Sequence, residues 1–452
     1  MSRDLVLTQP QIRPRWLSLV EDPPTQLEPE ALTPRSPEPL RVETPNPNVA
    51  RRPLSLDTRR DASRRALADP SSQLRRAQTE QQLISRNGNN KSKDGNTNAA
   101  QVASPELVWS TAEKQLPAWD LNQDGFLSRS ELEKVAQDPK VKGLDAAVLM
   151  SLLSNLDEIQ ALSNDEYGFE NDGITGKDLG ELRKLGDKAE LNQKVVGTAG
   201  WGLQKSQTST DLFDQDGPNY DAVKQGSLGS CEFLSAAVAL AKRDPEAIKK
   251  MISDNGDGSY TVRFPGSKDP IRVTLSDAEL GRAATAGKDG RWISVLEKAY
   301  GQFMNQRALL PSDSPQLATE SQPGRLAMKA LTGREGDQDI LGPVTTNLAT
   351  TRKKLTEAMQ DGRLVTAGIA KELITKGTDG LPANHQYTVL NYDPKTDQIT
   401  LRNPWGGGEL RDANGKPRDG KNDGVFTMSL TDFYARFNDV VYETRAPRQK
   451  RQ

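Results

Sequence analysis

The stretch Gln225-Gly226-Ser227-Leu228-Gly229-Ser230-Cys231-Glu232-Phe233-Leu234-Ser235 holds the only cysteine of the 452 residues. An apolar run with helical spacing follows, which predicts that Cys231 begins a helix over residues 231–242. A lone cysteine is more often a small buried hydrophobic side chain than a reactive group. At a helix N-terminus, however, the helix dipole lowers the pKa of a thiol and favours the thiolate. We therefore treat Cys231 as a candidate nucleophile.

The single histidine and an asparagine downstream make the chemical interpretation stronger. Two strand-like runs, 386–392 and 398–403, are joined by a turn sequence, so a hairpin is expected to bring His385 beside Asn403. A lone histidine is usually structural. Together with the sole thiol, however, these two residues form the set that thiol-based acyl transfer requires: an imidazole base and an amide that orients it. Gln225 could add an oxyanion donor, and Trp405 could shield the His–Asn hydrogen bond from water.

Composition limits the other possibilities. Only 34% of residues are hydrophobic and 27% are charged, which predicts that part of the chain is unfolded. A net charge of −2 gives no bulk reason to expect nucleic acid or an anionic membrane as partner. One cysteine excludes an intramolecular disulfide framework, and one histidine excludes a multi-histidine metal centre. With no apolar run of membrane-spanning length and no signal-peptide core, we expect a soluble, cytoplasmic protein of undetermined oligomeric state.

The first part of the chain is predicted to be a disordered tail and linker, over residues 1–101. Prolines crowd its first half, an arginine-rich patch follows over 51–65, and an Asn/Gly/Lys linker covers 87–98. Only residues 66–84 have the pattern of a short helix.

A calcium-binding loop is predicted from Asp120 to Glu131. Acidic and amide side chains fall at alternate positions, a glycine follows for the sharp turn, and a glutamate closes the stretch, as in an EF-hand loop. The expected Ca²⁺ ligands are Asp120, Asn122, Asp124, the carbonyl of Phe126, and Glu131. The alternative is a polar turn with acids present by chance. Periodic apolar residues around the loop predict a small all-α, EF-hand-like domain over 102–195.

A second loop is expected because EF-hands usually occur in pairs. Residues 170–178 contain an Asp-Gly turn, but the hydrophobic residue comes one place early, and Leu179 stands where the closing glutamate would be. We expect a degenerate or shortened partner loop that pairs structurally and binds calcium poorly. A further acidic and glycine-rich cluster, 254–258, lies before a strand-like run and is interpreted as a hairpin turn.

The remaining sequence, 200–447, has the composition of a folded enzyme. A second helix is predicted over 292–303, further strands over 260–264 and 271–275, and loops over 311–324 and 406–424. The predicted fold class is α+β.

Several motifs in this part occur together in one order. They are Gln-Gly-x-Leu-Gly-x-Cys-x-Phe-Leu at 225–234, Trp-Ile-Ser-Val-Leu-Glu-Lys-Ala-Tyr at 292–300, Leu-Thr-Gly at 331–333, His-x-Tyr-x-Val at 385–389, and Arg-Asn-Pro-Trp-Gly at 402–406. The combination resembles the calpain family of cysteine proteases, over about residues 200–445.

The resemblance implies a papain-like fold of two lobes, about 200–338 and 339–447, with the active site in the cleft between them. By position it makes Cys231 the nucleophile, His385 the base, Asn403 the orienting residue and Gln225 the oxyanion donor. Gly229, Glu232 and Trp405 would support the site or contact substrate. The implied partners are protein substrates and calcium.

Three features depart from the family pattern. Glu232 occupies the position after the nucleophile where the family usually has tryptophan, and a carboxylate there could raise the pKa of the thiol or change the substrate subsite. Gly290 and Arg291 precede Trp292, where a calcium ligand would be sought. The EF-hand also comes before the protease part, whereas animal calpains carry theirs after it.

The hypothesis is a calcium-responsive cysteine endopeptidase that makes limited cuts in proteins and processes its own N-terminal tail. One alternative is a catalytically weak calpain-like module that binds proteins in a calcium-dependent way. Another is a transglutaminase-like acyltransferase, which uses the same thiol chemistry but normally an aspartate in place of Asn403.

Overall fold

The computed structural model describes residues 104–445, with gaps at 164–172, 207–210, 215–216, 309–314, 321 and 371–380. All the described residues lie within one compact unit that spans 67–452. The predicted disordered tail and the predicted helix at 66–84 lie outside the described residues. Three hydrophobic cores organise the described part of the chain.

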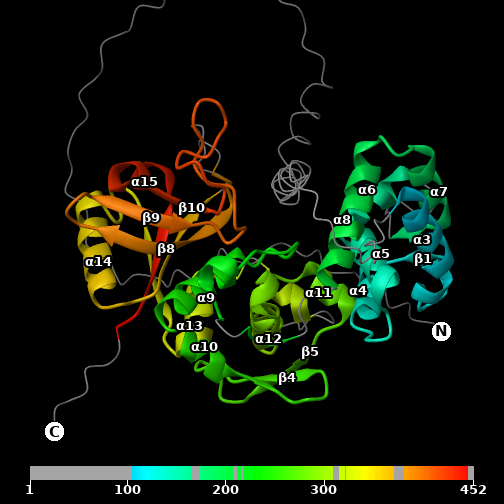
Figure 1. Ribbon diagram of the computed structural model, residues 1–452, viewed down its shortest axis with the longest axis horizontal. Coiled ribbons are helices and arrows are strands. Elements are labelled where there is room, and N and C mark those ends of the chain that lie inside the picture. Colours follow the sequence, from blue (N-terminus) through cyan, green and yellow to red (C-terminus); the bar gives the residue numbers. More distant parts are fainter. Residues whose placement is uncertain are drawn as a thin grey trace, which may run out of the picture. The chain divides into compact units, whose positions relative to one another are not determined.

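The first core belongs to a helical region at the N-terminal end of the described chain (Figure 1). Three of its helices begin at residues whose side chains cap them: Ser104 caps α3, and capping boxes start α4 and α7. The elements are α3 (Pro105–Trp119), α4 (Arg129–Ala136), α5 (Gly143–Ser154), α6 (Leu156–Ile159), η1 (Gln160–Leu162), α7 (Gly176–Lys184) and α8 (Glu190–Ser206). Helix α8 packs along α5 and therefore carries the helical region past 195, its predicted end.

Two short strands join the two loops of this region. Strand β1 (Phe126–Leu127) pairs antiparallel with β2 (Ile174–Thr175), with Leu127 opposite Ile174. This register makes Asp178 the counterpart of Glu131, since each carboxylate is the third helical residue of a capping box and accepts from its cap. The expectation that Leu179 occupies the closing position is wrong: Leu179 is buried in the core, and Asp178 has that place.

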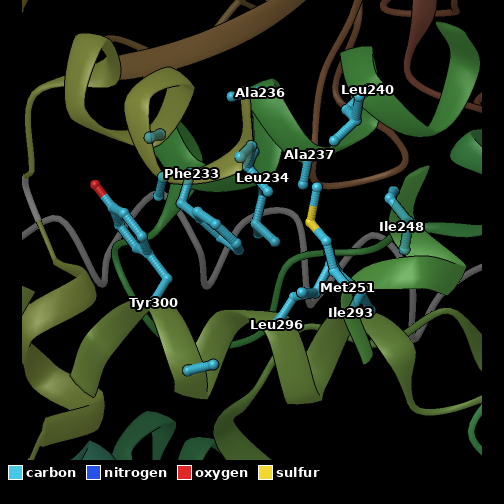
Figure 2. Packing of buried hydrophobic residues seen from close by; sticks show 14 of the residues in the cluster. Phe233, Leu234, Ala236, Ala237, Leu240, Ile248, Met251, Ile293, Leu296 and Tyr300 are labelled. Atoms are coloured by element: carbon cyan, nitrogen blue, oxygen red, sulfur yellow. The ribbon is translucent and has the colours of Figure 1, made fainter. Parts of the chain in front are cut away.

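The second core surrounds helix α9 (Cys231–Arg243). Phe233 stacks on Tyr300 of helix α12 with ring centroids 4.4 Å apart, and Leu234, Leu240 and Leu296 belong to the same buried cluster (Figure 2). The other elements are η2 (Tyr220–Ala222), α10 (Pro245–Met251), β3 (Ile252–Asp254), β4 (Ser259–Val262), β5 (Ile271–Thr274), α11 (Asp277–Arg282), η3 (Gly287–Asp289), α12 (Trp292–Asn305), η4 (Pro315–Thr319) and α13 (Gly324–Thr332).

The third core lies on a six-stranded antiparallel sheet of order β10-β9-β8-β7-β11-β6. Its elements are β6 (Gly336–Ile340), α14 (Leu348–Gln360), β7 (Val365–Ile369), β8 (His385–Asp393), β9 (Gln398–Arg402), β10 (Val425–Ser429), α15 (Leu430–Arg436) and β11 (Asp439–Glu443). The predicted lobe boundary at 338/339 falls inside β6. Because Gly336 already pairs with Glu443, the sheet lobe begins at Gly336.

The predicted helices and strands of residues 200–447 are confirmed, with ends displaced by one to two residues. The acidic cluster 254–258 forms the turn of a β3–β4 hairpin, as expected. Two hydrogen bonds join the helix and sheet lobes beside the predicted site: Ser235 Oγ donates to the carbonyl of Gln386 at 3.0 Å, and Thr388 Oγ1 donates to the carbonyl of Ser235 at 2.8 Å. Among the described residues, no helix combines the length and apolar character needed to cross a membrane.

Candidate active site

The predicted nucleophile occupies the first position of α9, directly after a loop that we call the nucleophile loop (residues 224–230). Gly226 is required there by a close backbone approach, because a Cβ atom would lie 1.9 Å from the carbonyl oxygen of Arg282. Glu297 of helix α12 holds the last residue of this loop: its fully buried carboxylate accepts from Ser230 Oγ at 2.5 Å. Sequence reasoning did not single out Glu297, although it lies within the quoted stretch 292–300.

The histidine and asparagine meet as the hairpin predicts. His385 Nε2 lies 2.8 Å from Asn403 Oδ1. Asn403 Oδ1 also accepts from the backbone N–H of Trp405, while its Nδ2 donates to the carbonyl of Gly408. These two bonds fix the amide orientation, so Nε2 of His385 carries the proton and Nδ1 is left as the basic nitrogen. The ring of Trp405 covers the imidazole, with centroids 4.4 Å apart.

The thiol hydrogen-bonds to the carboxylate next to it. Cys231 Sγ lies 3.2 Å from Glu232 Oε2, and among the described residues no hydrogen bond joins Cys231 to His385. Burial, followed by the charge and hydrogen bond of Glu232, raises the pKa of the Cys231 thiol well above its usual value; the backbone amide of Gln386 acts in the opposite direction. The expectation that the helix N-terminus gives this thiol a lowered pKa is therefore wrong, because burial and the adjacent acid outweigh the dipole.

Burial also changes the pKa of the histidine, in the opposite direction to that of the thiol. It lowers the pKa of His385 to about 4, and the hydrogen bond to Asn403 only partly opposes this shift. At neutral pH the site therefore holds a neutral thiol and a neutral imidazole, and a thiolate–imidazolium pair forms only if the proton moves between them.

The remaining predicted residues lie around this pair. Gln225 joins the two lobes, since its backbone N–H donates to the carbonyl of Pro404 at 2.9 Å, but its side-chain Nε2 donates to the carbonyl of Leu228. The Gln225 amide thus holds the nucleophile loop in this state. Gly229 is exposed and its N–H donates to Glu320 at 3.3 Å, so a carboxylate that the sequence analysis did not single out contacts the nucleophile loop.

Cysteine, histidine and asparagine placed on a helix start and a neighbouring antiparallel sheet are the arrangement of papain-like thiol proteases. The family model described as calpain family cysteine protease matches residues 183–442, more than half of the chain. The chain belongs to the calpain family of cysteine proteases.

Three curated relatives match about half of the chain. Calpain-type cysteine protease DEK1 of Arabidopsis thaliana is 27% identical over 272 residues, which are 53% of this chain and 12% of that protein. The DEK1 protein of Zea mays is 28% identical over 49% of this chain and 11% of its own length. Calpain-10 of Macaca fascicularis is 27% identical over 43% of this chain and 32% of its own length. The chain thus spans a third or less of these relatives.

The predicted calcium loop brings its acids together. Carboxylate oxygens of Asp120, Asp124 and Glu131 lie within 4.8 Å of one another. Asp120 Oδ1 is buried without a hydrogen-bond partner in the described structure. An orphaned carboxylate oxygen among acids is costly unless a cation or water satisfies it, so the donor set fits a hard cation such as Ca²⁺. The side-chain amide of Asn122 bonds to Asp124: its Nδ2 donates to the Asp124 carboxylate, and its Oδ1 accepts from the backbone N–H of Asp124.

Both carboxylate oxygens of Glu131 accept hydrogen bonds from within the loop. Its Oε1 accepts from the backbone N–H groups of Leu121 and Asn122, and its Oε2 accepts from Ser128. Burial works against ionisation, but the bonds from Ser128, Asn122 and Leu121 outweigh it and lower the pKa of Glu131. To close a calcium shell with both oxygens, Glu131 would have to release these backbone donors.

A second cluster of acidic residues, which the sequence analysis missed, lies in the sheet lobe. It consists of Glu409, Asp419 and Asp423, in the predicted loop 406–424. Glu409 is 1% exposed, and its Oε2 has no hydrogen-bond partner among the described residues. Burial and the two aspartates raise the pKa of Glu409 to about 7. The only sequence signal was a run of acids and glycines, which is equally typical of an ordinary loop.

Proposed function

We propose that this calpain-family protein is a calcium-responsive cysteine endopeptidase that makes limited cuts in protein substrates. The observation that carries the proposal is the His385–Asn403 pair on the sheet lobe, whose Nδ1 makes no hydrogen bond among the described residues, together with the only thiol of the chain. The family membership supports a hydrolase of peptide bonds. It also disfavours the transglutaminase-like alternative.

In the proposed reaction, Nδ1 of His385 takes the proton of Cys231 as the sulfur attacks the peptide carbonyl. Asn403 holds the imidazole in the required tautomer, because its Oδ1 accepts from Nε2–H. The imidazolium then protonates the leaving amine, and water hydrolyses the thioester after giving its proton to the same nitrogen. The Cys231 backbone N–H and the Gln225 amide are the proposed donors to the oxyanion, which requires Gln225 Nε2 to turn from Leu228.

Calcium enters as the proposed regulator, held by Asp120, Asp124, Glu131, the Phe126 carbonyl and Asn122. The partnerless oxygens of Asp120 and Glu409 support cation binding at both acidic groups. A bound cation would neutralise the local charge and satisfy these oxygens. The second EF-like loop, closed by Asp178, is the weaker candidate: Asp178 is fully buried and already accepts from Ser163 and Thr175.

The deciding experiment is cleavage of casein, and of the protein itself, by the wild type and by Cys231→Ala across a calcium titration. We expect thiol-dependent cleavage that rises with calcium and is absent in the variant. Mass spectrometry of the wild type should then show cuts before about residue 102. A wild type that cleaves neither substrate at any calcium concentration contradicts the endopeptidase proposal. An intact N-terminus removes only the self-processing part.

A second candidate function is favoured by one observation, the bond between Cys231 and Glu232. If this bond keeps the thiol protonated under all conditions, the protein is a catalytically weak module that binds other proteins in a calcium-dependent way. That function predicts partner capture that needs calcium and is unaffected by Cys231→Ala. The two functions separate because only the endopeptidase loses its activity in that variant.

A further inference from the structure

Helix α11 (Asp277–Arg282) lies between the N-terminal helical region and the nucleophile loop. It packs against both α5 and α8, and Ala278 is part of the hydrophobic core of the helical region. At its other end, α11 runs into residues 283–285, which contact the nucleophile loop. One short helix therefore belongs to both parts.

On the side of the helical region, α11 is held by a buried ion pair. Arg282 Nη1 donates to both carboxylate oxygens of Glu133, at 2.8 and 3.0 Å, and the two side chains are 7% and 5% exposed. The neighbouring contacts are also polar: Ser276 Oγ donates to the carbonyl of Ala136, and the N–H of Gly143 donates to Asp277 at 3.0 Å. A buried ion pair depends strongly on geometry, so Glu133 fixes Arg282 in one position.

On the side of the active site, the backbone of the same arginine holds the nucleophile loop. The carbonyl of Arg282 accepts from the N–H of Ser227 at 2.9 Å, and Gly226 lies against it without room for a Cβ. Lys224 and Thr285 exchange two backbone hydrogen bonds, at 2.7 and 2.8 Å. A shift of Arg282 must therefore move the loop that precedes Cys231.

We propose that Arg282 is a positioning residue for the nucleophile loop, and that Glu133 of helix α4 sets its position. The connection also reaches the calcium loop, because Glu131 and Glu133 lie two residues apart on the eight-residue helix α4. When Glu131 releases the backbone donors of Leu121 and Asn122 to bind a cation, the first turn of α4 rearranges. Glu133 and Arg282 pass this change to Ser227. This second step rests on the proposed calcium response, whereas the positioning role does not.

The positioning role is tested without calcium, through the alkylation of Cys231 by iodoacetamide. Because Cys231 is the only cysteine, the reaction reports on this site alone. Glu133→Gln and Arg282→Gln should each change the alkylation rate, and should lower kcat about ten- to a hundredfold with KM little changed, as a misplaced reacting group does. The matched control is Arg272→Gln on β5, which breaks an exposed ion pair between Arg272 and Asp257.

A double variant separates positioning from general destabilisation. If the pair acts as a unit, Glu133→Gln with Arg282→Gln should be no worse than either single variant, because the second change has nothing left to break. Losses that multiply, or single variants that behave like Arg272→Gln, overturn the inference. Should Arg282→Gln fail to fold, Glu133→Gln alone carries the test, since it leaves every residue after 200 unchanged.

The calcium step is tested by two measurements on one sample. Calorimetry gives calcium binding, and hydrogen exchange gives the protection of the Ser227 amide. In the wild type calcium should change that protection; in Glu133→Gln calcium should still bind while the Ser227 amide no longer responds. Equal responses in both proteins overturn the connection. A protein that binds no calcium contradicts the proposed calcium response instead, and leaves the alkylation result to decide the positioning role.

Discussion

The two halves of the active site differ in how far they are prepared for catalysis. On the sheet lobe, His385 and Asn403 already have the hydrogen bond, the tautomer and the aromatic cover that a general base needs. On the helix lobe, Cys231 is bonded to Glu232, and the Gln225 amide is bonded inside its own loop. The proposed base is thus preorganised, whereas the proposed nucleophile and the proposed oxyanion donor would have to rearrange.

The difference has a physical origin in the secondary structure. A hairpin fixes the relation between two strands through its register, and Trp405 and Gly408 hold Asn403 from the loop that follows. No such register holds the first side chains of a helix, so they can hydrogen-bond to different partners. Cys231 therefore takes the nearest acceptor, the carboxylate of the next residue.

The largest effect on the cleavage rate is expected from removing the imidazole of His385, the proposed base. His385→Ala should lower the cleavage rate by about 10²- to 10⁴-fold, the usual contribution of a general base. Steady-state cleavage of a peptide substrate measures it. Asn391→Ala, on the exposed side of the same strand, should leave the rate unchanged and serves as the control. Equal rates in all three proteins would mean that the base lies elsewhere.

An intermediate effect is expected on the unprepared half. Glu232→Gln removes a negative charge from beside the sulfur, so the thiolate becomes less costly and the pKa of Cys231 falls. The pH profile of iodoacetamide alkylation should move to lower pH, and the rate at pH 7 should rise about tenfold for each unit of that change.

The control for this prediction is Glu320→Gln. Glu320 contacts Gly229 and makes no hydrogen bond to the sulfur among the described contacts. If both variants move the profile equally, the effect is one of overall charge and the Cys231–Glu232 bond has no special role. If neither does, burial alone sets the thiol pKa.

Sequence reasoning was strongest where local pattern determines structure. The helix at Cys231, the hairpin from His385 to Asp393 and on to Arg402, and the contact of Asn403 with His385 were all predictable from periodicity, turn residues and family motifs. What the sequence did not predict depends on burial. Glu232 gave a reason in the sequence to expect a raised pKa of Cys231, but the larger contribution of burial required knowing that the helix start is covered.

The missed residues share the same cause. Glu297, Glu320 and Glu409 were missed because their structural roles depend on contacts with residues distant in sequence. The close approach of Gly226 to Arg282 could not be predicted either, since Arg282 lies more than fifty residues away in the sequence. Likewise the position of Asp178 follows from the β1–β2 register rather than from spacing in the loop.

The smallest effect, and the most direct view of the prepared half, concerns the pKa of the single histidine. Burial lowers the pKa of His385 to about 4, while the bond to Asn403 raises it. Trp405→Ala admits water and should move this pKa up toward its ordinary value near 6.5. Asn403→Ala removes the stabilising acceptor and should move it down, provided the ring stays buried. Because His385 is the only histidine, its imidazole proton signals in NMR can be titrated without assignment, in the Cys231→Ala background. Shifts of opposite sign in the two variants establish that cover and acceptor act separately on the base. If both variants raise the pKa, Asn403 acts mainly by keeping water out, and the preparation of this half lies in its burial rather than in its hydrogen bond.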